Sequence, residues 1–128
     1  MVDILLEKIK TGFSLVMDPR YKNKQNSLTS YLMSAFSVFH LKDPSLLHYR
    51  HNYRERSENL IRIYGIETLY SDSAMRNAID IIKPSELQKM FSVFLALLEQ
   101  QGVMSSYKVL KDYHIIAFDG TQHYHCQG

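Results

Sequence analysis

The 128-residue sequence has no tryptophan, a single cysteine and no long apolar run. Because Cys126 is the only cysteine, an internal disulfide is excluded and a reducing, cytoplasmic setting is expected. The longest uncharged stretch, residues 25–41, is too short and too rich in Ser, Thr, Gln and Asn to span a bilayer, so we expect no membrane association. Asp3 and Glu7 stand where a signal peptide would carry a cationic and then an apolar segment, and secretory targeting is therefore not expected.

Charge is distributed unevenly, although the formal net charge is only +2. Residues 20–62 form a basic segment, and residues 48–64 (HYRHNYRERSENLIRIY) interleave four arginines with three tyrosines: Arg50, Arg54, Arg56, Arg62, Tyr49, Tyr53 and Tyr64. Guanidinium groups bind phosphate in a forked geometry, and aromatic rings pack against sugars and bases. The pattern predicts contact with nucleic acid. The alternative is a solvated helix face on which Glu55 and Glu58 pair with the arginines.

Three segments carry apolar residues at helical spacing, namely residues 3–17, 27–41 and 85–101. Ser27 is predicted to cap the second segment, and Ser85 with Gln88 forms a capping box for the third. Shorter helices are expected at residues 45–49 and after the Ser-Asp-Ser sequence at 71–73. The faces predicted to lie in the core are Leu28, Tyr31, Leu32, Ala35, Phe36 and Phe39 in the second segment, and Leu87, Met90, Phe91, Phe94, Leu95 and Leu98 in the third.

Near the end of the sequence lies a short apolar run, residues 115–118, which is followed by Asp119 and Gly120. Such a run is typical of a strand that is buried on both faces. We therefore expect a mainly α chain, with a helical region at residues 1–111 and a terminal β-hairpin within residues 112–128. Asp119 either opens an Asp-Gly turn of this hairpin or serves as a ligand of a magnesium ion.

Two stretches, SDSAMRNAID at residues 71–80 and AFDGTQHYH at residues 117–125, stand in a characteristic order with a Gln-Gly-Val sequence at 101–103 between them. With the basic, tyrosine-rich segment upstream, they resemble the amino-terminal half of the DDE transposases of bacterial insertion sequences. The resemblance implies a helical amino-terminal region followed by a ribonuclease H-like α/β catalytic domain. In that domain the first strand carries the first of three acidic metal ligands, and Asp119 matches this position.

Several roles follow from the resemblance. It implies a catalytic and metal-binding role for Asp119, with Mg²⁺ as the cofactor of phosphoryl transfer in DNA transposition. It also implies binding to transposon ends through Arg50, Arg54, Arg56 and Arg62.

The second and third acids are not found within these 128 residues, and one carboxylate cannot hold two metal ions. We therefore expect the polypeptide alone to bind DNA without cleaving it and without binding Mg²⁺, so whether it acts as an enzyme is uncertain. The alternative is a truncated, non-catalytic helical module that regulates transposition. Such a module would bind the transposon ends or full-length transposase, or form a homo-oligomer.

Overall fold

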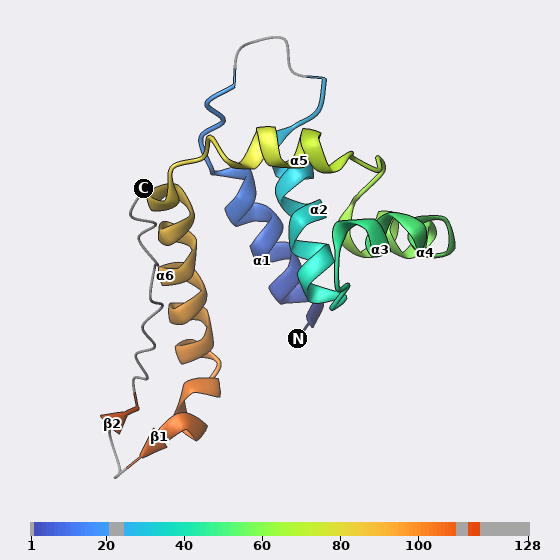
Figure 1. Ribbon diagram of the computed structural model, residues 1–128. Helices are drawn as coiled ribbons and strands as arrows, with labels where there is room; N and C mark the ends of the chain where they lie inside the picture. Colours follow the sequence, from blue (N-terminus) through green and yellow to red (C-terminus); the bar gives the residue numbers. More distant parts are fainter. Residues whose placement is uncertain (1, 21–24, 110–112, 116–128) are drawn as a thin grey trace, which may run out of the picture. The chain divides into compact units, whose positions relative to one another are not determined.

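The computed structural model describes residues 2–20, 25–109 and 113–115 (Figure 1). These residues are mainly helical, which confirms the predicted class. The chain divides into two units, Met1–Ser92 and Val93–Gly128, which are described separately below. The predicted boundary between residues 111 and 112 lies outside the described residues. None of the helices in the described ranges has the length and apolar character needed to cross a membrane.

Helices α1 (Val2–Ser14) and α2 (Leu28–His40) pack against each other in the first unit. As predicted, Ser27 is the N-cap of α2, and its hydroxyl accepts a hydrogen bond of 3.1 Å from the Ser30 backbone N–H. Phe39, which was predicted to lie in the core, is 81% exposed. Its place in the interior is taken by Ser37, whose hydroxyl hydrogen bonds to the buried Tyr49 hydroxyl at 2.9 Å. Ser34, Ser37 and Val38 are buried near the end of α2, and Phe39 lies outside this buried face.

The arginine-rich segment forms three short helices, α3 (Leu46–His51), α4 (Tyr53–Asn59) and the π-helix η1 (Leu60–Tyr64). Figure 1 shows α3 and α4 side by side in green. Gly65 ends η1 with a positive φ of 67°, a conformation that glycine adopts without steric cost. The Ile66 N–H then donates to the Leu60 carbonyl at 3.1 Å, which closes the end of the helix.

Helix α5 (Asp72–Ile79) contacts α2 and is capped by Ser71, the first residue of the Ser-Asp-Ser sequence after which a helix was predicted. A cluster of buried residues joins the two helices, and in it the rings of Tyr31 and Tyr70 lie 4.1 Å apart between centroids. The Tyr70 hydroxyl also hydrogen bonds to the Ser30 hydroxyl at 2.7 Å. The core of the first unit is thus built around α2.

Helix α6 (Pro84–Gln100) begins one residue earlier than predicted, so Ser85 lies inside the first turn and does not cap it. Proline suits this position because the first turn of a helix needs no backbone N–H. Met90 is buried over Gly12, as the predicted core face requires, but Phe91 is 71% exposed and Leu95 is also exposed. The prediction was wrong for these two residues, because apolar spacing along a helix does not show which of its side chains are covered.

In the second unit, α6 is followed by the 3-10 helix η2 (Val103–Tyr107) and by two short strands, β1 (Lys108–Val109) and β2 (Tyr113–His114). The strands pair antiparallel, with Lys108 opposite His114. Ile115 was predicted to lie in a buried strand but is 76% exposed, because a ribbon with two residues in each strand cannot bury a side chain by itself. Residues 116–128, which hold the rest of the predicted hairpin, lie outside the described residues. A ribonuclease H-like continuation of the fold stays a prediction.

Candidate nucleic-acid interface

Three of the four predicted DNA-binding arginines are exposed: Arg50 on α3, Arg54 on α4 and Arg62 on η1. Within the described part of the chain, none of them forms an ion pair, and Arg62 makes only a long hydrogen bond of 3.4 Å to the Asn59 side chain. Their guanidinium groups are therefore free to bind a phosphate.

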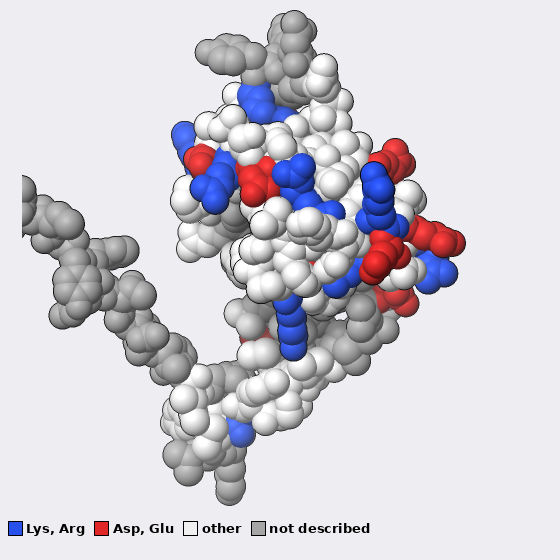
Figure 2. Space-filling view, turned by 45° about the vertical axis from the view of Figure 1, so that its right-hand side comes forward, with Lys and Arg blue, Asp and Glu red and all other residues white. Residues whose placement is uncertain are grey.

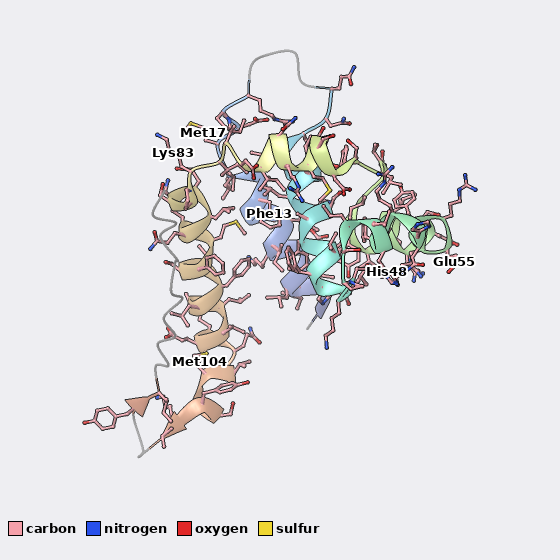
Figure 3. The ribbon with its side chains drawn as sticks, viewed as in Figure 1. Phe13, Met17, His48, Glu55, Lys83 and Met104 are labelled. Atoms are coloured by element: carbon pink, nitrogen blue, oxygen red, sulfur yellow. The ribbon has the colours of Figure 1, made fainter. Side chains whose placement is uncertain are left out.

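Acidic residues lie on the same helices. Figure 2, in which this side of the molecule comes forward, shows basic and acidic side chains interspersed. Glu55 and Glu58 are exposed, and Figure 3 shows Glu55 at the outer end of α4. Neither carboxylate is paired with an arginine among the residues that the structure describes. The Glu–Arg pairs of the alternative interpretation are therefore not formed, although the acids reduce the positive potential of the surface.

Arg56 differs from the other three arginines because its guanidinium is occupied. Its Nη1 donates a hydrogen bond of 2.8 Å to Asp43 Oδ2, and the side chain of Asp43 is only 1% exposed. A buried carboxylate is costly unless it is paired and hydrogen bonded, so this arginine contributes to the fold. Asp43 lies in the connection between α2 and α3, and sequence reasoning predicted no contact between it and the arginines.

The second partner of Asp43 is His48 on α3, whose Nδ1 lies 2.6 Å from Asp43 Oδ1. The side-chain nitrogen of Asn52, the residue between α3 and α4, lies 3.2 Å from the same His48 nitrogen. His48 is exposed on its outer side (Figure 3). One carboxylate therefore contacts both helices that carry Arg50 and Arg54.

Two of the three tyrosines cannot pack against a base, because Tyr49 and Tyr64 are buried. The Tyr49 hydroxyl hydrogen bonds to Ser37, and the Tyr64 hydroxyl lies 2.7 Å from His40 Nδ1. Burial raises the pKa of both hydroxyls above the ordinary value for tyrosine. Both tyrosines therefore hold α3 and η1 against α2, and the predicted stacking role is left to the half-buried Tyr53.

Lys10 on α1 is a basic residue near this surface that sequence reasoning missed. Its Nζ lies close to the end of η1, since a Cβ built on Gly65 would come within 3.1 Å of it. A cation near the carboxyl end of a helix is favourable because the last carbonyl groups there carry partial negative charge. No local signal in the sequence relates residue 10 to residue 65.

Asp119, the predicted catalytic and metal-binding residue, lies outside the described residues. Within the described ranges, no group of three or more His, Cys, Asp or Glu side chains is arranged to hold a metal ion. The role of Asp119 and the Mg²⁺ requirement therefore stay predictions. The candidate site that can be built from described residues is the arginine surface of α3, α4 and η1.

Comparisons of this chain with protein-family models, with curated proteins and with solved structures gave no match. The functional argument therefore rests on the motifs of the chain and on the geometry of its side chains.

Proposed function

We propose that this chain is the DNA-binding amino-terminal part of a DDE transposase, and that α3, α4 and η1 form its contact with the DNA backbone. The proposed DNA-binding role rests on one observation. Arg50, Arg54 and Arg62 are exposed and have no ion-pair partner in the described residues. The motifs at residues 71–80 and 117–125 support the proposed assignment to the DDE transposases.

The three arginines would bind phosphate oxygens and so fix the position of the protein on the duplex without selecting its sequence. Binding of this kind releases counterions, so the affinity falls steeply as salt is added. In this proposal Asp119 is the first acidic ligand of the catalytic site and Mg²⁺ is the cofactor of the complete enzyme. The 128-residue polypeptide would then bind DNA without cutting it.

The test is a fluorescence anisotropy titration of a labelled duplex of mixed sequence at several KCl concentrations. Three phosphate contacts predict a slope of log K against log[KCl] of about −2.7, which weakens binding about 40-fold between about 50 and 200 mM. Arg54→Gln should reduce the magnitude of the slope by about 0.9. Arg76→Gln, which removes an exposed arginine of α5, is the matched control and should leave the slope unchanged.

Two results would contradict the proposal. One is wild-type binding that does not depend on salt, or no binding at all. The other is an equal effect of Arg54→Gln and Arg76→Gln, which would mean that only overall charge matters. Strand cleavage by the 128-residue polypeptide in the presence of Mg²⁺ would contradict the expectation that it is inactive alone.

A second candidate, a helical module that regulates transposition through protein contacts, is favoured by the second unit. Val93, Leu95, Tyr107 and Tyr113 of this unit are exposed apolar or aromatic side chains. Exposed apolar surface of this kind is typical of a protein contact. Sedimentation velocity tests the homo-oligomer form of this candidate. Association that persists at high salt and survives Arg50→Gln and Arg54→Gln would support it, and a monomer at all salt concentrations would contradict it.

A further inference from the structure

Asp43 joins α3 and α4, two of the three helices that carry the proposed phosphate contacts. Its Oδ1 lies 2.6 Å from His48 Nδ1 on α3, and its Oδ2 accepts a hydrogen bond of 2.8 Å from Arg56 Nη1 on α4. Building on the proposed function, we propose that Asp43 is a positioning residue that fixes Arg50 and Arg54 relative to each other, and that Arg56 acts by holding Asp43 and does not contact phosphate.

Such a connection matters because α3 and α4 are short and bury few side chains of their own. Helix α3 has six residues and α4 has seven, and one residue, Asn52, separates them. Isolated helices below about 12 residues are marginal in water. Helix α3 has one buried side chain, Tyr49, whereas α4 has none. Helix α4 continues directly into η1, where Leu60 and Tyr64 are buried, and the pair between Arg56 and Asp43 is the described ion pair that joins α4 itself to the connection before α3.

The burial of Asp43 makes this connection costly to break. Its carboxylate is withdrawn from water and has two cationic or hydrogen-bonding partners, whereas His48 and Arg56 both keep contact with solvent. Without the charge on Asp43, both partners can turn outward and be hydrated. Helix α4 would then be held only through η1, and the position of Arg54 relative to Arg50 would be less fixed. Arg50 and Arg54 would then have to be ordered when they bind phosphates, and this ordering would reduce the affinity for DNA. In the wild-type protein the two arginines are already positioned before DNA binds.

The substitution Asp43→Asn gives opposite results under two explanations. If Asp43 acts only as a negative charge beside a DNA-binding surface, its removal strengthens binding, because an anion near the phosphates is repulsive. If Asp43 positions the arginines, its removal weakens binding. The ordering of one or two side chains predicts a loss of roughly 3- to 10-fold in affinity.

The experiment measures duplex binding by Asp43→Asn and His48→Gln at a temperature where circular dichroism shows each variant to be folded like the wild type. His51→Gln is the matched control, since His51 is also exposed on α3 and has no contact with Asp43 among the described residues. Both test variants should bind more weakly, and His51→Gln should bind like the wild type. Unchanged or tighter binding by Asp43→Asn, or an equal loss in His51→Gln, would overturn the inference.

Amide hydrogen exchange tests the connection without DNA. In Asp43→Asn the amides of α4 should exchange faster than in the wild type, while those of α5 should not change. Unchanged exchange in α4 would overturn the positioning role even if DNA binding fell. If the wild type binds DNA with the expected salt slope but Asp43→Asn has no effect, only the positioning role fails. If the wild type does not bind, the proposed function fails, and exchange in α4 still tests whether Asp43 anchors that helix.

Discussion

Truncation of Leu60 should cost the first unit a large part of its stability. Leu60 is 1% exposed at the start of η1, whereas its neighbour Ile61 is 48% exposed. The sequence LIRIY gives no reason to choose between these two apolar residues. The substitutions Leu60→Ala and Ile61→Ala therefore test which face of the π-helix lies in the core.

The expected magnitudes follow from burial. Leu60→Ala removes three buried carbon atoms, which is about 2.4 kcal/mol of transfer free energy at about 0.8 kcal/mol per carbon. The cavity that remains adds to this, so the free energy of unfolding should fall by about 3 kcal/mol. Ile61 is half exposed, so its truncation leaves no enclosed cavity and should cost about 1 kcal/mol. For a domain of this size the loss in Leu60→Ala lowers Tm by roughly 12 °C or more.

The assay is urea denaturation followed by circular dichroism, with the midpoint and the slope m fitted for both variants and the wild type. A lower midpoint at unchanged m would show that the folded state has lost stability. Equal losses in the two variants would refute the described orientation of η1. A larger loss in Ile61→Ala would place Ile61, and not Leu60, in the core.

Two further predictions concern the same part of the fold. Gly65→Ala should lower the free energy of unfolding by about 1 kcal/mol, because the positive φ of 67° is strained for alanine. The nearby Lys10 side chain can move aside and adds little to this cost. Equal stability of Gly65→Ala and the wild type in urea would contradict the prediction. Burial raises the pKa of the Tyr49 hydroxyl, so the folded state holds this proton more tightly than the unfolded chain does. The contribution of this hydroxyl to the free energy of unfolding is complete below about pH 10 and is lost as the pH rises through the folded-state pKa. Tyr49→Phe should therefore make the free energy of unfolding less dependent on pH above about pH 9. Equal pH dependence in Tyr49→Phe and the wild type would contradict the prediction.

Helix starts were predictable because a cap is a local interaction. Ser27 and Ser71 each accept a hydrogen bond from a backbone N–H three residues further along the chain. The residues that decide such a start lie within one turn of each other, so the sequence alone contains the signal. Ser85 did not follow this rule because Pro84 already occupies the first helical position.

The buried faces of the helices were harder to predict, because contacts with residues distant in the sequence determine which face is covered. Apolar spacing places Phe39 on the inner face of α2, yet the polar Ser37 lies in the interior, where it hydrogen bonds to Tyr49, 12 residues away. On α6 the same spacing gives an apolar arc but does not show how much of it is covered. Phe91 therefore fits the helical pattern and is still mostly exposed.

In the candidate site, too, the residue composition was evident from the sequence, whereas the contacts of each side chain were not. Counting charges finds four arginines in residues 48–64 and treats them as equivalent. The structure separates them, because Arg56 is bound to Asp43, 13 residues earlier in the chain. Sequence reasoning could have suspected this only from the presence of an acid shortly before the arginines of residues 48–64.

This separation changes what determines the affinity in the proposed DNA complex. Residues 43–64 contain four arginines against three carboxylates, so their net charge is close to zero and attraction at long range is weak. Affinity must then come from short-range contacts between guanidinium groups and phosphates, whose strength depends on geometry. A surface of this kind is sensitive to the relative placement of α3 and α4. For this reason a buried acid that holds the two helices together should strengthen DNA binding, although its own charge opposes it.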